Sequence, residues 1–253
     1  MNRIENYEEL KNRIVKWLGD YVLENPSIKS FVVGVSGGID SGVVSTLCAE
    51  TGIPTFVLSM PLNSTSKNDD LSDSYCNTLE EKYINVTKVR VDLSPVYERF
   101  ISSLDFWIGD GEYTSNDLTN ANTKSRLRMV TLYQVAGNVG GIVVGTGNKV
   151  EDYGVGFYTK YGDGGVDIAP IADLYKTEVW ELGKHLGVDQ RIIDAPPTDG
   201  LWEDSRTDED QIGASYAELE EAMELGTGPA VDVLAKFNAQ NKHKMNPIPT
   251  FKL

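Results

Sequence analysis

The chain has 253 residues, of which 40% are hydrophobic and 24% are charged, a composition typical of a soluble globular protein. Its formal net charge of −15 disfavours binding to nucleic acids or anionic membranes, because those surfaces are themselves negative. The length allows one large α/β domain or two small ones, and we expect a single domain over residues 1–253.

The start of the chain predicts an amphipathic helix, since apolar residues recur at helical spacing over residues 4–22 and the pattern ends near Asn25. This segment is rich in charge and lacks the apolar core of a signal peptide, and no later segment has the length of a membrane span. We therefore expect a cytoplasmic protein. Cys48 and Cys76 are too few for a disulfide framework and lack metal-ligand spacing, which favours structural roles for both.

A glycine-rich turn follows the first predicted strand, Phe31–Val35, and precedes a predicted helix, Ser41–Glu50. Backbone N–H groups and the positive end of the helix converge on such a turn, which predicts a phosphate site. Ser36 adds a hydroxyl donor. Asp40 would repel phosphate unless a cation lay between them, and this indicates Mg²⁺. The alternative is an ordinary strand-to-helix turn in which glycine serves only the backbone geometry.

The pattern along the chain predicts an α/β fold, a parallel twisted sheet with helices on both faces. The turns after the strands would then meet at one edge of the sheet, where such proteins bind ligands. Further strands are expected over Thr55–Met60, Asn85–Val91 and Gly141–Thr146, and helices over Asn120–Asn138, Lys176–Leu186, Gln211–Ala222 and Pro229–Gln240. Two long irregular segments, Phe106–Thr119 and Ala195–Asp208, predict loops that become ordered when substrate binds.

The string Ser-Gly-Gly-Ile-Asp-Ser at residues 36–41 resembles the pyrophosphate loop of the ATP pyrophosphatase superfamily. Three further strings, at residues 122–129, 145–152 and 157–167, narrow the resemblance to the ammonia-dependent NAD synthetases. The third contains Thr-Lys-Tyr-Gly-Asp-Gly-Gly, which is specific to that family. The resemblance covers nearly the whole chain and implies a Rossmann-like fold of the adenine nucleotide alpha hydrolase type.

The resemblance implies a ligase that forms a C–N bond with ATP as co-substrate. The nicotinate carboxylate of deamido-NAD would attack the α-phosphorus of ATP and release pyrophosphate, and ammonia would then displace AMP to give NAD. The residues implied for ATP are Gly34, Val35, Ser36, Gly37, Gly38, Ile39, Asp40, Ser41, Thr146, Lys176 and Thr198; those for Mg²⁺ are Asp40 and Glu151; those for deamido-NAD are Arg126, Lys160, Asp167, His243 and Lys244. Asp40 is also assigned a catalytic role. Arg126 could instead be an ordinary solvated charge on its helix.

Free ammonia is the expected nitrogen donor, because glutamine-using relatives carry an additional glutaminase domain and synthetase motifs fill this chain. A separate glutaminase could also deliver the ammonia. Asp163 is a candidate for the group that accepts the proton of ammonium. His243 and Lys244 lie near Pro247, where a chain would normally be frayed. The resemblance implies that this tail folds over the dinucleotide, in its own or a partner subunit, since the family forms homodimers.

Two other functions fit parts of the sequence. Another adenylating ligase of the superfamily, such as a GMP synthetase, would share the loop, the metal and the adenylate. A nucleotide sensor without catalytic activity would need the loop but not both carboxylates, Asp40 and Glu151. A tRNA thiolation enzyme is disfavoured, because it would need catalytic cysteines and a basic face for RNA.

Overall fold

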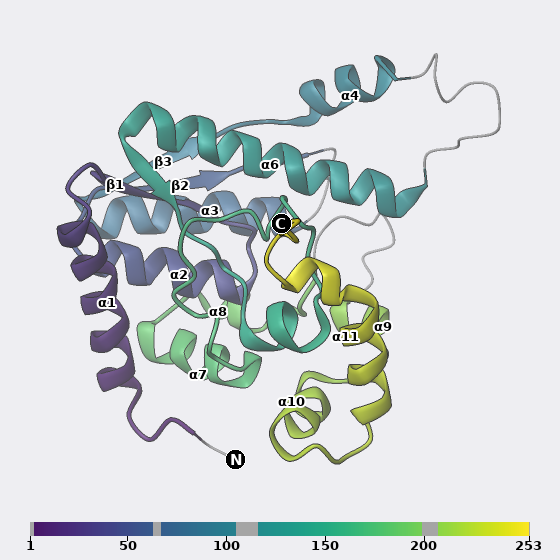
Figure 1. Ribbon diagram of the computed structural model, residues 1–253. Coiled ribbons are helices and arrows are strands. Elements are labelled where there is room, and N and C mark those ends of the chain that lie inside the picture. The colour runs from purple at the N-terminus through teal and green to yellow at the C-terminus, as the bar shows by residue number, and fades with distance from the viewer. Residues whose placement is uncertain (1–2, 63–66, 105–115, 199–206, 253) are drawn as a thin grey trace.

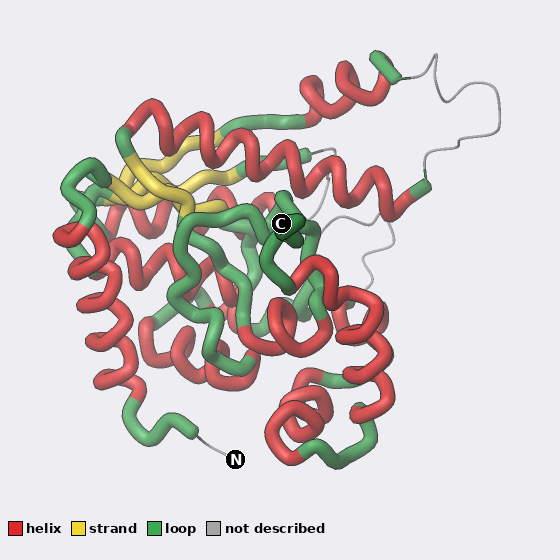
Figure 2. The backbone as a smooth tube through the Cα atoms, viewed as in Figure 1, coloured by secondary structure: helices red, strands yellow, loops and turns green. Residues whose placement is uncertain are grey.

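A computed structural model describes residues 3–62, 67–104, 116–198 and 207–252. These residues contain a parallel sheet of four strands in the order β3-β2-β1-β4, with helices on both faces (Figures 1 and 2). The predicted α/β class is therefore confirmed. The strands are β1 (Ser30–Gly34), β2 (Thr55–Ser59), β3 (Val86–Arg90) and β4 (Gly141–Val143).

The helices predicted from the sequence are present, with two exceptions given below, together with short helices that were not predicted. They are α1 (Tyr7–Glu24), α2 (Ile39–Glu50), α3 (Lys67–Lys82), α4 (Ser94–Ser102), α6 (Asp117–Val139), α7 (Lys176–Leu186), α8 (Gln190–Ile193), α9 (Asp208–Ile212), α10 (Tyr216–Leu225) and α11 (Val231–Met245), together with the π-helix η1 (Val150–Val155). No helix among the described residues combines the length and apolar character of a membrane span.

The alternating side chains of β1 divide the core into two layers. Phe31 and Val33 point to one face and pack with residues of α1, α2, α3 and α7. Val32 points to the other face and packs with residues of α6 and the segment before α4. All three side chains are fully buried. The continuous apolar run therefore belongs to a strand with both faces covered, as predicted. Figure 1 shows α4 and α6 on one side of the sheet and α2 and α3 on the other.

The strand order creates a switch point between β1 and β4. The chain leaves β1 through α2 toward β2, and later returns to the opposite side of β1 to form β4. The connections that follow these two neighbouring strands therefore diverge, which leaves a crevice at their carboxyl ends. The phosphate turn after β1 and the segment after β4 border this crevice.

A third apolar cluster joins η1, α9, α10 and α11 to α7. Here two predictions were wrong. The helix expected over Gln211–Ala222 is two helices, because Gly213 adopts a left-handed φ of 83° and Ser215 caps a new helix. Helix α11 continues to Met245, so His243 and Lys244 lie in its last turn and not in an irregular tail.

The two predicted substrate loops fall largely outside the described residues. Of Phe106–Thr119, the described part begins at residue 116, and its last residues belong to α6. Of Ala195–Asp208, residues 199–206 lie outside the described part, and Asp208 begins α9. Their expected ordering by substrate stays a prediction.

Candidate active site

A cavity of about 790 Å³ opens at the carboxyl ends of β1 and β4. Its walls come from the turn after β1, the segment after β4, η1 and the starts of α7 and α9, with α6 and the end of α11 on the remaining sides. The sequence-predicted residues that line it are Gly34, Val35, Ser36, Gly38, Ile39, Asp40, Ser41, Arg126, Thr146, Glu151, Lys160, Asp163, Lys176, Thr198, His243 and Lys244. The fold thus brings residues from distant parts of the sequence into one space.

The turn after β1 is held in shape by its two serine side chains. The hydroxyl of Ser41 accepts a hydrogen bond from the backbone N–H of Ser36 at 3.1 Å, and the hydroxyl of Ser36 accepts one from that of Gly38 at 3.2 Å. Gly37 has a φ of 87°, a conformation that side chains rarely adopt. The N-terminus of α2 has no side-chain cap. Its first residues, Ile39, Asp40 and Ser41, line the cavity, so the positive end of the helix dipole lies beside it, as anion binding requires.

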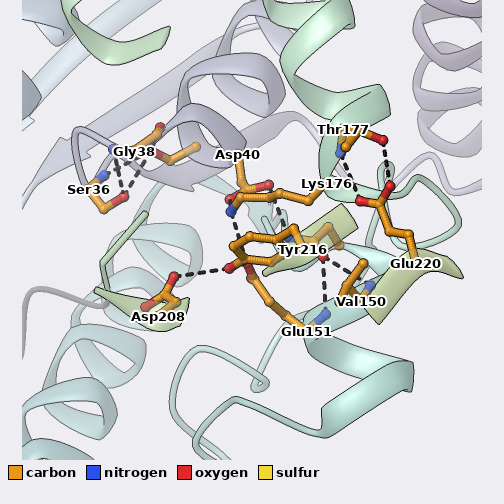
Figure 3. Close-up of polar contacts among 12 residues, drawn as sticks. Ser36, Gly38, Asp40, Val150, Glu151, Lys176, Thr177, Asp208, Tyr216 and Glu220 are labelled. Carbon is orange, nitrogen blue, oxygen red and sulfur yellow. Dashed lines mark hydrogen bonds and ion pairs between the residues drawn. The ribbon is translucent and has the colours of Figure 1, made fainter. Parts of the chain in front are cut away.

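Three charged side chains meet beside this turn (Figure 3). The ammonium group of Lys176 lies 2.5 Å from Oδ2 of Asp40 and 2.8 Å from Oε1 of Glu151. Asp40 comes from the first turn of α2, Glu151 from η1, and Lys176 from the first residue of α7. Burial alone would lower the pKa of Lys176, but the two carboxylates outweigh it and raise the pKa. Lys176 is therefore a cation held between two anions.

Asp40 and Glu151 form a pair that suits Mg²⁺, because Mg²⁺ in nucleotide sites takes one or two protein carboxylates and completes its shell with water and phosphate oxygens. Among the described residues there is no cluster of three or more acidic, histidine or cysteine side chains that could hold a metal alone. The donor set therefore fits a cation that shares its ligands with a bound polyphosphate.

Polar neighbours hold the charged cluster in place. Asn148 donates to Oδ1 of Asp40 at 3.2 Å, and its amide oxygen accepts the backbone N–H groups of Val150 and Glu151, both at 3.1 Å. The hydroxyl of Tyr216 donates to Glu151 at 2.7 Å. Neither Asn148 nor Tyr216 was singled out from the sequence, because a lone polar residue carries no spacing signal.

Asp152 faces the cavity next to the cluster. A Cβ atom at Gly147 would overlap the carboxylate of Asp152, so any larger residue here would displace that carboxylate. Burial, followed by the negative charges of Glu151 and Asp163, raises the pKa of Asp152 to about 8. In the sequence, no motif distinguishes Asp152 from an ordinary loop charge.

Basic side chains occupy the other end of the cavity. Lys244 donates to the backbone oxygens of Gly156 and Tyr158 at 2.7 and 2.8 Å, and burial lowers its pKa. Arg126 donates to the backbone oxygen of Lys160 at 3.3 Å. These cations are paired with neutral carbonyl groups, and so they differ from Lys176.

The glycine-rich loop between these cations is tied to α6 through Asp163. Its carboxylate accepts the hydroxyl of Ser125 at 2.7 Å and the backbone N–H of Thr159 at 3.0 Å. The backbone N–H of Asp163 donates in turn to Ser125 at 2.9 Å. Desolvation raises the pKa of Asp163. Ser125 therefore anchors the loop to α6.

Two predicted residues are not among those that line the cavity, Gly37 and Asp167. The carboxylate of Asp167 accepts hydrogen bonds from the hydroxyl of Tyr133 at 3.0 Å and from the backbone N–H of Val143 at 2.8 Å. It therefore satisfies the backbone N–H of the last residue of β4. Lys149 pairs with Asp173 at 2.8 Å and is likewise not a lining residue.

A parallel sheet with an anion-binding turn and paired carboxylates at its switch point defines a nucleotide-binding α/β enzyme. The comparisons with known proteins identify the family. The model of the NAD synthase family matches residues 10–248, and the chain belongs to this family of ligases.

Relatives and solved structures agree with this assignment. An NH(3)-dependent NAD(+) synthetase of Carboxydothermus hydrogenoformans is 36% identical over 241 residues, which are 94% of this chain and 95% of the relative. The structure of the NMN synthetase from Francisella tularensis has 33% identity and a TM-score of 0.87, and the match covers 99% of this chain and 100% of the other. An NH3-dependent NAD synthetase from Campylobacter jejuni, with 24% identity and a TM-score of 0.75 over 98% of this chain and 100% of the other, has the same fold.

Proposed function

We propose that the chain catalyses the ATP-dependent amidation of deamido-NAD to NAD with free ammonia. The observation that carries the proposal is the single cavity in which the anion-binding turn, the pair Asp40 and Glu151, and the basic side chains of α6 and α11 face one another. This arrangement suits a reaction between two anionic substrates, for which positioning and charge neutralisation supply most of the catalysis.

ATP binds at the end formed by β1. The N–H groups and hydroxyls of residues 34–41 hold its phosphates, with further contacts from Thr146, Lys176 and Thr198. Asp40 and Glu151 would hold Mg²⁺, and the ion would supply positive charge to balance the charge that develops on the departing pyrophosphate. A carboxylate oxygen of the nicotinate attacks the α-phosphorus, and the bond from that phosphorus to the bridging oxygen breaks.

The dinucleotide binds at the other end, where Arg126, Lys160 and Lys244 supply positive charge and the ring of His243 supplies a further polar contact. Lys244 can turn from the carbonyls of Gly156 and Tyr158 to an anionic substrate, since charged acceptors bind ammonium more strongly than neutral ones. Asp163 takes the proton of ammonium, so that ammonia attacks the carbonyl carbon and AMP leaves. Its raised pKa supports this role.

The active form is a cytoplasmic homodimer. Along α4 and α6, exposed apolar side chains such as Val96, Phe100 and Val130 form a surface that a second copy of the chain would cover. The residues that hold the dinucleotide would then come from one or both subunits.

Nicotinic acid mononucleotide is a second candidate substrate. The fold overlaps the NMN synthetase with a TM-score of 0.87 at 33% identity, compared with 0.75 at 24% identity for an NAD synthetase. The mononucleotide contains the same nicotinate carboxylate, so the chemistry at Asp40 and Glu151 would be unchanged and only the contacts to the remainder of the substrate would differ.

One assay tests both candidates. The protein is incubated with ATP, Mg²⁺ and ammonium, and with either deamido-NAD or the mononucleotide, and the products are separated by chromatography. NAD, AMP and pyrophosphate in equal amounts are expected, with a higher kcat/KM for deamido-NAD. A higher kcat/KM for the mononucleotide would favour the second candidate, and no amide from either would contradict both. Replacement of ammonium by glutamine should abolish the product.

A further inference from the structure

Tyr216 lies beside the charged cluster without being part of it. It is the first residue of α10, its side chain is 1% exposed, and its ring packs edge-on against Trp180 at 5.9 Å. The hydroxyl lies 2.7 Å from Oε1 of Glu151 and 3.1 Å from Oδ2 of Asp208 (Figure 3). A single buried hydroxyl thus faces two carboxylates.

The contact to Glu151 orients that carboxylate. Oε1 of Glu151 accepts hydrogen bonds from both Lys176 and Tyr216. Lys176 is shared with Asp40, and in the proposed function it also contacts ATP. Tyr216 has no proposed contact with substrate, and the packing of its ring against Trp180 fixes its position. A hydrogen bond to one carboxylate oxygen fixes the direction in which the other oxygen can bind a cation.

Asp208 is a second acceptor for the single proton of the Tyr216 hydroxyl, and it extends the connection to the nucleotide. Asp208 is the first residue of α9, and its backbone N–H donates to the backbone oxygen of Pro197 at 3.0 Å. Pro197 precedes Thr198, which lines the cavity. One chain of contacts therefore runs from Glu151 through Tyr216 and Asp208 to the segment assigned to ATP.

We propose that Tyr216 is a positioning residue that orients Glu151 for the metal carried by ATP, and that Asp208, the second acceptor within reach of the same hydroxyl proton, sets how that proton is shared with Glu151. The proposal rests on the proposed metal pair, Asp40 and Glu151. It assigns the hydroxyl a role in metal affinity, whereas a purely structural tyrosine would act through its ring.

The variant Tyr216→Phe separates these roles, because it keeps the ring and removes the hydroxyl. Mn²⁺ binding is measured by electron paramagnetic resonance in the presence of α,β-methylene-ATP, which cannot be cleaved at the reacting bond. We expect Mn²⁺ affinity to fall by about tenfold, as for other groups that orient metal ligands, and the KM for deamido-NAD to stay within about twofold. The matched control is Tyr75→Phe, a buried tyrosine whose hydroxyl contacts Thr46 at 2.7 Å away from the cavity lining.

Wild-type Mn²⁺ affinity in Tyr216→Phe, or an equal loss in Tyr75→Phe, would overturn the proposal. Should Tyr216→Phe fail to fold, Asp208→Asn decides, since it leaves the tyrosine in place and changes the second acceptor of its proton: a Mn²⁺ affinity changed by about threefold or more in either direction, a smaller effect than loss of the hydroxyl itself, supports the proposal, and an unchanged affinity overturns it. A wild-type protein that binds no Mn²⁺ with the ATP analogue would instead contradict the proposed metal pair, and this outcome is distinct from the first two.

Discussion

The two ends of the cavity hold their positive charges in different ways. At the nucleotide end, Lys176 lies between the carboxylates of Asp40 and Glu151, at 2.5 and 2.8 Å. At the dinucleotide end, Lys244 donates to two backbone oxygens. Removal of Lys176 would leave two buried negative charges without their counterion, whereas removal of Lys244 would leave only neutral carbonyls. The nucleotide end is therefore tied to the stability of the fold, whereas in the proposed function the other end releases its cation to a substrate.

The largest effect is expected from Lys176→Met, which tests the first half of this comparison. Two carboxylates left without a counterion should lower the free energy of unfolding by about 3 kcal/mol. Denaturation in urea measures this, with Lys184→Met as the control, since Lys184 and Glu181 form an exposed pair worth at most about 0.5 kcal/mol. Mn²⁺ should restore part of the loss in Lys176→Met. An equal change in both variants would contradict the comparison.

Gly147→Ala tests how tightly the nucleotide end is packed. The new methyl group would overlap the carboxylate of Asp152 and should destabilise the protein by about 2 kcal/mol. Gly19→Ala is the control, because no atom lies within 4 Å of its added Cβ and its position inside α1 should give a gain of about 0.5 kcal/mol. Thermal unfolding of both variants checks the prediction, and a neutral Gly147→Ala would show that the approach is loose.

Lys244→Met tests the second half of the comparison. We expect the KM for deamido-NAD to rise by about tenfold, the equivalent of one charge-assisted hydrogen bond, while the KM for ATP and the stability change little. Lys242→Met, at an exposed position of the same helix, serves as the control. Equal effects on both substrates would mean that Lys244 acts on the whole cavity and not on one end.

The smallest effect is a pH dependence of stability at Asp152, measured without metal. Its folded-state pKa of about 8 lies above its ordinary value, so the folded protein binds more protons than the unfolded chain between about pH 4 and pH 8. The stability contribution of the protonated carboxyl is therefore lost as pH rises through this window. Asp152→Asn should gain about 1 kcal/mol over wild type between pH 5 and pH 8. Parallel stability curves would contradict the assigned cause, which is burial beside Glu151, Asp163 and Asp40.

The strands were predicted well because their signal is local. The apolar run before the phosphate turn predicted Phe31–Val35, and the strand is Ser30–Gly34. Periodicity failed at Gln211–Ala222, where the helical pattern continues through a glycine that stops the helix. The last turn of α11 was missed because its stability comes from contacts with the loop at Gly156, which no local pattern reveals.

The candidate site was predicted as a set of residues but not as an arrangement. Motifs indicated Asp40, Glu151 and Lys176 separately. The contact of both carboxylates with the ammonium group of Lys176 depends on the strand order, which no motif contains. The supporting residues Asn148 and Tyr216 were missed, because a polar side chain acquires its role from a partner far away in the sequence; Tyr216 and Glu151 are 65 residues apart.

The π-helix η1 has a consequence for chain length at the metal pair. Its wide turn is closed by the backbone N–H of Gly156 on the oxygen of Glu151, and such turns contain one residue more than an α-helical turn. Deletion of a single residue between Glu151 and Gly156 would restore an ordinary α-helical turn. Either the carboxylate of Glu151 would then move away from Asp40, or the loop after Gly156 would be displaced. The spacing of this segment is thus as much a part of the enzyme as the identity of its side chains.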